Sequence, residues 1–413
     1  MSSTSYWQAT AETGNIPHPE APPLTGDCAT EVAIVGAGVA GTAIALELAR
    51  AGKEVRVLEG RQIAAGASGR NAGFITSTTG EPYATIVTRL GRDKARRLRA
   101  FHSHNDALAT TLIAELVERG WSCEYQRDGI LRLANSEEEL ADIQENVTEL
   151  NHDGWPVTLL TQSELPSRLR QHYLGGLLHL DSGSLHPAKF VRGLALLAQE
   201  AGATFHSETP VKAITVDKDG VTLTTPAGNI RARDVVLATN AWLPEIGQLL
   251  NTANADWLTR CIQPTRGQVI ATESIDERLF PYPCSADHGY QYWRQLADRR
   301  LVVGGWRNHS FATENTTDET AGGVVQQQLD AFVHGTLNLP EVRITHRWAG
   351  IMAFSADGLP LIGTLPGTLH CYITGGFTGH GNASALQAAR IMRELVSGRT
   401  HPQAELFDPA RFL

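Results

Sequence analysis

Three glycines at fixed spacing could build a phosphate-binding turn. Gly36, Gly38 and Gly41 directly follow a short apolar run at residues 31–35. In this G-x-G-x-x-G arrangement the first glycine permits a tight turn, the second lets a pyrophosphate approach the backbone, and the third lets the next helix pack close to the strand. The helix N-terminus then offers free N–H groups to the phosphate. The spacing predicts a dinucleotide site, and the alternative is a glycine turn in an ordinary βαβ unit.

An acidic residue follows at the distance that such a site requires. Residues 55–58 form a second apolar run, and Glu59 ends it. An acid about 20 residues after the glycines accepts hydrogen bonds from the ribose of an adenosine. Because a carboxylate there would repel a 2′-phosphate, the pattern disfavours NADP.

A second glycine-rich loop lies just beyond the acid, where residues 66–73 read GASGRNAG. A nicotinamide enzyme has no evident need for another glycine-rich loop at this place. A bound flavin does, since backbone must run close to its pyrophosphate and ring. The loop therefore favours FAD over NAD.

Three motifs together carry a family resemblance: SYWQAT at residues 5–10, the glycine fingerprint, and GASGRNAG. With them the chain resembles the glycine/sarcosine/D-amino-acid oxidase superfamily of FAD-dependent oxidoreductases, and within it the branch typified by γ-glutamylputrescine oxidase. The resemblance extends, with gaps, from Ser5 to about Gly398. It implies an FAD enzyme that oxidises the C–N bond of an amine or amino acid.

A second strand–glycine loop–helix unit lies near the C-terminus, where residues 375–382 read GGFTGHGN. A positive helix end aimed at a reduced flavin, which carries negative charge, would favour reduction. The resemblance assigns the GFTGHG segment to that place, and the alternative is a structural glycine turn. His380 is ambiguous on its own, because a histidine in a glycine loop can simply hydrogen-bond the backbone.

The cofactor-binding candidates combine these motifs with positions that the resemblance implies, among them the returning strand that ends near Trp242. They are Gly36, Ala37, Gly38, Val39, Ala40, Gly41, Glu59, Gly60, Arg61, Gly66, Ala67, Ser68, Arg70, Asn71, Ala72, Gly73, Val211, Thr239, Trp242, Gly350, Gly376, Phe377, Thr378, Gly379, His380 and Gly381.

Flavin oxidation of an amine needs little acid–base help from the protein, because the cofactor itself accepts the hydride. The amine must be neutral, and a dry aromatic pocket disfavours the ammonium. The regions expected to face the flavin carry five aromatic residues, whose alternative role is core packing: Tyr290, Tyr292, Trp293, Trp306 and Trp348. The catalytic candidates are Tyr290, Tyr292, Arg294, Trp306 and His380.

Departures from the family pattern narrow the range of expected substrates. No cysteine follows the Trp-containing segment at residues 347–350, so we expect non-covalent FAD. The places of the family's carboxylate-binding arginines hold Met352 and Thr378, which removes a bidentate clamp there. This favours a conjugated amine, such as a γ-glutamylputrescine-like compound, over glycine or sarcosine. A different clamp remains open from Arg294, Arg307 or Arg347.

The electron acceptor stays open, because the lysine credited with oxygen activation in sarcosine-type members has no counterpart at residues 292–294. The leading hypothesis is an amine oxidase that reduces O2 to H2O2. One alternative is an amino-acid oxidase or a dehydrogenase with another electron acceptor. Another is a non-catalytic flavin-binding subunit of a complex. The sequence leaves the oligomeric state undetermined.

Bulk composition excludes several classes. The 413 residues carry a net charge of -9 without a long basic run, which argues against nucleic acid and anionic membranes as partners. We expect no membrane span and no secretory signal, which makes the cytoplasm the default location. The five cysteines are scattered, so we expect neither a disulfide framework nor a metal site.

These motifs must be positioned by at least two structural units. The expected fold class is α/β (α+β), with a Rossmann-like FAD-binding domain interleaved with an antiparallel-sheet substrate domain. The expected segments are an extended arm with a loose tip at 1–30, a discontinuous cofactor domain at 31–80, 181–245 and 346–413, and a substrate or cap domain at 81–180 and 246–345.

Local patterns predict the elements within these units. We expect helices at residues 83–120, 137–153, 187–202 and 317–335, and a helix ending near residue 396. We expect strands near 211–216, 221–225, 234–238, 263–272 and 370–374, and a hairpin over 289–305 that turns at Asp298 and Arg299.

Overall fold

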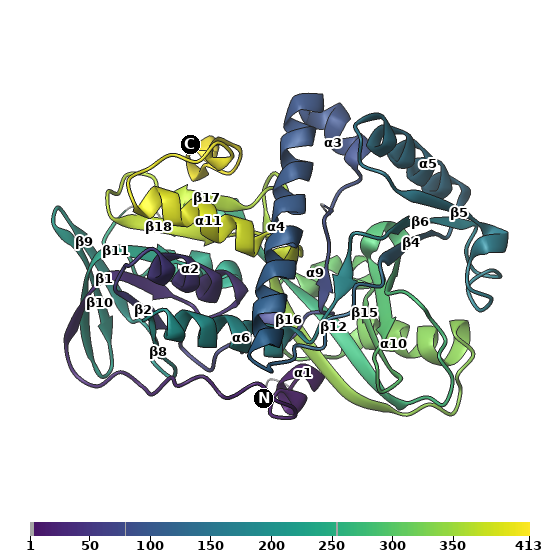
Figure 1. Ribbon diagram of the computed structural model, residues 1–413, viewed down its shortest axis with the longest axis horizontal. Coiled ribbons are helices and arrows are strands. Elements are labelled where there is room, and N and C mark those ends of the chain that lie inside the picture. Colours follow the sequence, from purple (N-terminus) through teal and green to yellow (C-terminus); the bar gives the residue numbers. More distant parts are fainter. Residues whose placement is uncertain (1–3, 79, 253–254) are drawn as a thin grey trace.

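Two mixed units lie side by side, each built on an eight-stranded sheet (Figure 1). The computed structural model describes residues 4–78, 80–252 and 255–413. The long helix α4 (Arg92–Glu118) stands between the two units. The arrangement confirms the predicted mixed α/β class.

The first sheet has the parallel core that a dinucleotide site requires. Its order is β17-β18-β11-β1-β2-β8, and all neighbours pair in parallel except β17 and β18. Helix α2 lies between α6 and α11 against this sheet. The strands are β1 (Cys28–Val35), β2 (Val55–Leu58), β8 (Thr204–His206), β11 (Gly228–Leu237), β17 (Leu361–Thr364) and β18 (Cys371–Gly375), with the hairpin β9 (Ala213–Asp217) and β10 (Gly220–Thr225) on β11; the helices are α2 (Val39–Arg50), α6 (Pro187–Glu200) and α11 (Ala385–Val396).

The second sheet is antiparallel except where β13 and β4 pair in parallel. Its order is β16-β12-β15-β14-β13-β4-β6-β5. The strands are β4 (Ile130–Ala134), β5 (Thr158–Thr161), β6 (Gly175–His179), β12 (Ile262–Ser274), β13 (Cys284–Ala286), β14 (Gln291–Gln295), β15 (Arg300–Gly305) and β16 (Ile344–Ser355). The sheet packs against α5 (Glu137–His152) and α10 (Gly323–Ala331).

The strands of the two sheets alternate along the chain. Strand β16 pairs with β12 in the second sheet, although most of it falls in the 346–413 segment assigned from sequence to the cofactor domain. The remaining elements connect the units: α3 (Tyr83–Leu90), α7 (Leu243–Gly247), α8 (Ala255–Cys261), α9 (Phe311–Glu314), and the small pair β3 (Phe74–Ile75) with β7 (Gly183–Ser184).

The N-terminal arm is not purely extended, because it begins with helix α1 (Tyr6–Thr10). The Ser5 hydroxyl accepts from the N–H of Gln8, whose side chain accepts from the N–H of Ser5, and this reciprocal capping box starts the helix. Trp7 of the helix is fully buried. The predicted loose tip falls on residues 1–3, outside the described part of the chain.

Two predicted helices differ from the structure. The stretch 83–120 breaks into α3 and α4, because Gly91 between them has φ of 83°, outside the helical region. The predicted helix 317–335 begins only at Gly323 and ends in a single π-helical turn, Phe332–Thr336. Residues 317–322 form a loop instead, held by side chains of β12. The predicted strand near 211–216 runs over Ala213–Asp217.

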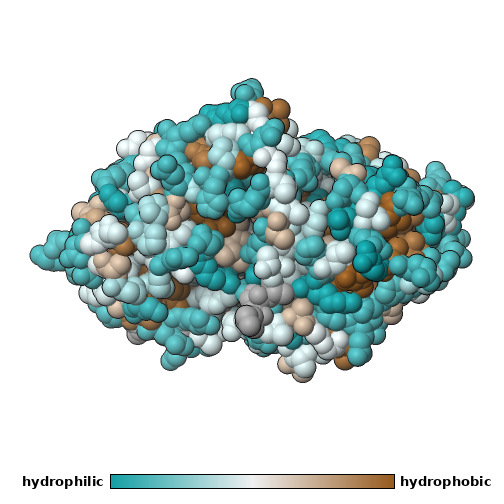
Figure 2. All heavy atoms as spheres, turned by 90° about the horizontal axis from the view of Figure 1, so that it is seen from below, coloured by the Kyte–Doolittle hydropathy of each residue, from teal (hydrophilic) through white to brown (hydrophobic). Residues whose placement is uncertain are grey.

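The outer surface carries no single dominant apolar patch on the face seen in Figure 2, where hydrophobic residues form small separate groups in a largely hydrophilic surface. Scattered exposed apolar residues are normal for a folded protein. Within the described residues, no helix combines the length and apolarity that crossing a bilayer would take.

Candidate functional site

One cavity of about 1680 Å³ connects the two units. It is lined by the glycine turn after β1, by residues 66–72, by the loop 377–384, and by the near face of the second sheet. Pockets for a single small ligand typically measure about 300–1,000 Å³. The cavity therefore has room for a dinucleotide together with a second ligand.

The glycine turn has the geometry that its spacing predicts. Gly36 has φ of 106°, a conformation that side chains disfavour. A Cβ on Gly41 would overlap the carbonyl oxygen of Gly36, so α2 packs this close to the strand only because the residue is glycine. A Cβ on Gly38 would lie 2.9 Å from Oγ of Ser68. The same hydroxyl accepts a hydrogen bond from the N–H of Val39 at 2.9 Å, which satisfies one of the free N–H groups at the start of α2.

The carboxylate of Glu59 is fixed beside this turn. Its Oε2 accepts from the N–H of Ala37 at 2.8 Å, and its Oε1 accepts from the N–H of Arg61 at 2.9 Å. The guanidinium of Arg61 lies over the Trp242 ring, 5.5 Å from the centroid. The hydroxyl of Thr239 lines the same region and is buried without a hydrogen-bond partner in the described chain. These features fit an adenosine ribose and a pyrophosphate, so the residues present suit FAD.

The loop 66–73 is braced from behind by the N-terminal helix. The Ser5 hydroxyl donates to the carbonyl of Gly69 at 2.6 Å, and Nε1 of Trp7 donates to the carbonyl of Asn71 at 2.6 Å. Arg70 of this loop donates to the carbonyl of Ala349 at 2.8 Å, which ties the loop to β16. The loop is therefore held rigidly at the junction of the two units.

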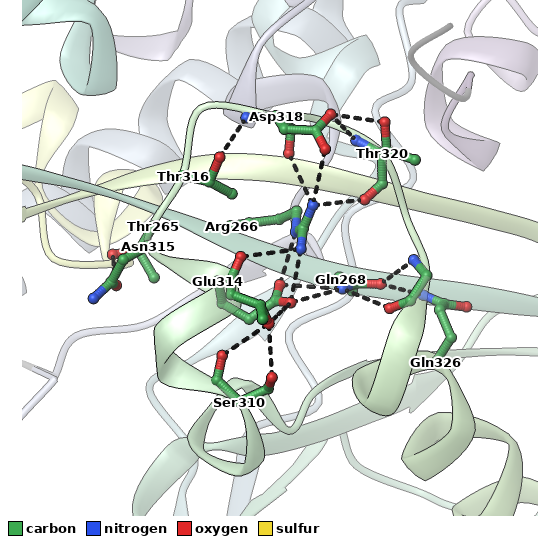
Figure 3. Close-up of polar contacts among 12 residues, drawn as sticks. Thr265, Arg266, Gln268, Ser310, Glu314, Asn315, Thr316, Asp318, Thr320 and Gln326 are labelled. Atoms are coloured by element: carbon green, nitrogen blue, oxygen red, sulfur yellow. Dashed lines mark hydrogen bonds and ion pairs between the residues drawn. The ribbon is translucent and has the colours of Figure 1, made fainter.

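A loop from the second unit closes over the same end of the cavity. Figure 3 shows Arg266 of β12 reaching Glu314, with Nε–Oε2 and Nη2–Oε1 distances of 2.8 and 2.9 Å. The side chain of Gln268 of β12 also donates a hydrogen bond to Glu314 and accepts one from the N–H of Gly322. This network holds residues 317–320 at the cavity wall. There Glu319 forms an ion pair with Arg61 at 2.8 Å.

The other end of the cavity is the face of the second sheet. Arg132, Ser285, Tyr292 and Gly304 lie directly opposite one another on four neighbouring strands, β4, β13, β14 and β15. Residues paired in this way point to the same face. A Cβ on Gly304 would overlap the ring of Tyr292, so the glycine lets that ring lie across the sheet. The first three of these side chains line the cavity.

Arg307 joins this wall from the turn after β15. Its guanidinium lies over two rings, 4.5 Å from the centroid of Tyr290 and 4.9 Å from that of Phe354. Burial lowers the pKa of Arg307, but an arginine stays protonated in proteins. In the described chain this guanidinium forms no hydrogen bond or ion pair, so it is available to an anionic group of a ligand.

Two titratable side chains at this end, Tyr292 and His380, are neutral near pH 7. Burial raises the pKa of Tyr292 to about 12. Burial also lowers the pKa of His380, whose Nδ1 lies 2.9 Å from the carbonyl oxygen of Thr378. That contact assigns the proton to Nδ1. The carboxylates that line the cavity in the described chain are Glu59, Glu81, Glu245, Asp318 and Glu319, and none forms an ion pair with Arg132 or Arg307.

Most of the residues selected from sequence lie along this cavity, including Tyr290, Tyr292 and His380. Among the cofactor-binding and catalytic candidates, six do not line it: Ala37, Gly41, Gly73, Gly376, Arg294 and Trp306. Trp293 and Trp348 of the aromatic set do not line it either. Four of these residues, Ala37, Gly41, Gly73 and Gly376, lie behind the cavity wall, where they shape turns and allow close contacts between segments.

Two of the catalytic candidates, Arg294 and Trp306, lie outside the lining of the cavity. Arg294 is buried; its Nη2 donates to the carbonyl of Leu185 at 2.8 Å, and its guanidinium lies 4.9 Å from the centroid of the Trp7 ring. Burial lowers the pKa of Arg294 to about 9. Trp306 packs in the apolar core of the second unit, 5.0 Å from the ring of Phe332. Arg347, the third possible clamp, is paired with Asp330.

Several cavity residues were missed from the sequence: Arg132, His179, Ser285 and Phe354. Arg132 had a usable signal, because it is the one charge in the apolar strand segment ILRLA. The others lie on three strands that are far apart in the chain, β6, β13 and β16, so no local pattern could have grouped them.

Comparison with known proteins gives consistent results. Residues 31–395 match the family described as FAD dependent oxidoreductase. The chain is 30% identical to the gamma-glutamylputrescine oxidoreductase of Escherichia coli (strain K12) over 388 residues, 92% of this chain and 85% of that protein. It is 28% identical to the glycine oxidase of Geobacillus kaustophilus (strain HTA426) over 377 residues, 89% of this chain and 92% of that protein. The crystal structure of glycine oxidase from Geobacillus kaustophilus matches with a TM-score of 0.77 and 25% identity, covering 93% of this chain and 98% of that one.

Proposed function

The chain belongs to the family of FAD-dependent oxidoreductases, and from this premise we propose that it oxidises the C–N bond of a conjugated primary or secondary amine, of the γ-glutamylputrescine kind, to an imine. The membership confirms the resemblance drawn from the sequence motifs. The family acts on amines and amino acids, and its cofactor is FAD.

The observation that carries the proposal is the continuity of the cavity. The cavity runs from Glu59, the carboxylate assigned to the ribose of the cofactor, to a wall formed by Tyr290, Tyr292 and Phe354. In the described chain no carboxylate belongs to this wall, so an ammonium group of a substrate would find no counter-charge there. Such a wall favours a neutral amine, because desolvation disfavours the charged form. FAD, when bound, supplies hydride acceptance. The residues of this chain bind the amine, keep water out and orient the reacting carbon.

The overall reaction balances without a proton donor or acceptor from the protein. The amine loses two electrons and two protons to become an imine, and O2 takes them up to give H2O2. Water then converts the imine to a carbonyl compound, with release of ammonia from a primary amine or of a smaller amine from a secondary one. We propose O2 as the acceptor; a different acceptor would make the same chemistry a dehydrogenase reaction.

Arg307 favours one alternative, an α-amino acid as substrate. Its guanidinium has no acidic partner in the described chain and lies in the aromatic wall, where it could replace the clamp that Met352 and Thr378 lack. A bidentate arginine–carboxylate pair would then orient the amino acid. The third reading, a non-catalytic flavin-binding subunit, predicts that no amine reduces the flavin in the isolated chain.

Anaerobic mixing of the holoprotein with a panel of amines tests these readings. The panel contains γ-glutamylputrescine, putrescine, N-methyl amines, sarcosine, glycine, and D- and L-amino acids. Loss of flavin absorbance with the conjugated amine supports the proposal, and readmitted air then measures reoxidation. Reduction by α-amino acids alone would replace the proposal with the arginine-clamp alternative.

We also propose that FAD is bound without a covalent link. In the described chain no cysteine lines the cavity; four of the five are buried and Cys28 is half-buried. Acid precipitation should leave all yellow colour in the supernatant. Colour in the protein pellet would contradict this assignment.

A further inference from the structure

Arg132 is a cation in the cavity wall without a counter-charge in contact. It lies on β4 and is half-buried. Its Nε is buried without a hydrogen-bond partner, and the described chain provides no ion pair for its guanidinium. Burial lowers its pKa, but the guanidinium remains protonated.

The nearby acids are committed elsewhere. Glu139 is fully buried, and its two oxygens accept from the N–H groups of His288 at 2.7 Å and Asn135 at 3.1 Å. It influences Arg132 only through space, as does Asp142. Glu139 therefore does not act as the missing partner.

The contrast with Arg99 shows that the chain does supply an acidic partner to another arginine of the cavity lining. Arg99 also lines the cavity, but it pairs with Asp181 at 3.0 Å and donates to the hydroxyl of Ser103 at 2.8 Å. A buried charge is costly unless it is paired and hydrogen-bonded. An arginine kept unpaired on a rigid strand is most simply explained by a partner that arrives with the ligand.

The position of Arg132 defines which part of a ligand it would meet. It is two strands away from Tyr292 in the same cross-strand row, so their backbones are separated by roughly 10 Å, twice the usual spacing between strands. His380 of the loop 377–384 lies close enough to feel the charges of both Arg132 and Arg307. Arg132 is therefore at the far end of the sheet wall from β15 and the turn that carries Arg307.

We infer that Arg132 binds a carboxylate at the non-reacting end of the substrate, so that the substrate is a linear amine with an acidic group several bonds from the oxidised carbon. This inference rests on the proposed function for the reacting end. The planar fork of arginine suits a carboxylate, which accepts two parallel hydrogen bonds. The neighbouring His179 stays neutral, since burial lowers its pKa, and adds no competing positive charge.

Matched ligands test the inference. The holoprotein is mixed anaerobically with ω-amino acids of increasing chain length and with the n-alkylamines of equal carbon count. At one chain length the acid should bind at least tenfold more tightly than its neutral analogue, as roughly expected for a hydrogen-bonded charge pair. In Arg132→Met that preference should disappear, while the limiting rate of flavin reduction changes little.

Three further variants make the result specific. Arg132→Lys keeps the charge without the fork and should retain part of the preference. Arg307→Met should retain the distal preference but weaken any discrimination for α-carboxylates. Arg231→Met removes a surface arginine paired with Asp217, far from the cavity wall, and should match the wild type. Bound flavin and an unchanged melting temperature qualify each variant for comparison.

Binding without turnover separates this inference from the proposed function. Alkanoates lack the amine and cannot be oxidised, but they should perturb the flavin spectrum of the wild type and not that of Arg132→Met. If no amine reduces the flavin while alkanoates still depend on Arg132, the proposed function fails and the anion site stands. If Arg132→Met binds acids and neutral analogues in the wild-type ratio, the inference is overturned.

Discussion

The two ends of the cavity are built from different materials. At the dinucleotide end the wall is backbone and small residues, with Gly36, Gly38 and Ser68 close to the start of α2. At the other end the wall is long side chains standing on a sheet, chiefly Arg132, Tyr292 and Arg307. The dinucleotide end fits its ligand through close approach of the ligand to the backbone. The sheet end fits its ligand through the direction in which the side chains point.

This difference separates two tasks. A wall of backbone leaves almost no freedom to change its ligand, because any added atom meets main chain that cannot move aside. A wall of side chains on a fixed sheet can change its ligand by single substitutions while the strands stay in place. We therefore expect changes at the first end to affect cofactor retention, and changes at the second to affect substrate choice.

The largest expected effect comes from Gly41→Ala. The new Cβ would overlap the carbonyl of Gly36, so α2 must move away from the strand. Overpacking of this kind costs about 1–3 kcal/mol, and here it also displaces the phosphate-binding turn. The flavin-to-protein absorbance ratio should fall strongly. Gly335→Ala is the control, since its Cβ would meet no atom within 4 Å.

A smaller loss is expected for Glu59→Arg. The change removes the acceptor for the N–H groups of Ala37 and Arg61 and brings positive charge to the ribose position. FAD affinity should fall roughly tenfold to a hundredfold, measured by titrating the apoprotein. Glu54→Arg, at an exposed site, should bind FAD normally. Full flavin occupancy in Glu59→Arg would remove the ribose assignment.

At the sheet end of the cavity, Tyr292→Phe should change the rate of flavin reduction and not the flavin content. The ring keeps its place over Gly304, and only the hydroxyl is lost. We expect unchanged flavin content and a roughly fivefold slower anaerobic reduction, the effect of one neutral hydrogen bond. If flavin is lost instead, Tyr292 supports the cofactor and the proposed separation between the two ends is wrong.

The smallest effect near neutral pH concerns His186, beside the N-terminal helix. Burial lowers its pKa to about 2, and its Nδ1 accepts from the N–H of Lys189 at 3.2 Å, so the folded state holds it neutral. An unfolded histidine has a pKa near ~6.5. Its stabilising contribution is thus complete above that pH and is lost as pH falls, by about 1.4 kcal/mol per unit. Urea unfolding from pH 7 to 5 should show a shallower decline for His186→Asn.

The parts of the fold that the sequence predicted are those specified over short distances. The fingerprint turn, Glu59 at the end of β2 and the start of α6 at Pro187 depend on neighbours in the chain. The predicted helix over 317–322 failed because Arg266 and Gln268 of a distant strand hold that loop. The position of Arg294 outside the cavity lining had no local signal either, since its environment is set by Trp7 and Leu185. Strand order in the second sheet, and with it the alignment of Arg132 with Tyr292, has no local signal.

The brace behind the loop 66–73 sets an order of events during translation. Helix α1 is synthesised before the β14–β15 hairpin, and it contacts the cofactor loop directly. Yet Tyr6 of that helix donates to Asp298 at 3.2 Å, and Trp7 lies beneath Arg294, both made much later. Helix α1 can therefore take up its final position only after the β14–β15 hairpin has been synthesised. The outer side of the cofactor loop is thus completed by a helix that was synthesised earlier than the hairpin that holds it.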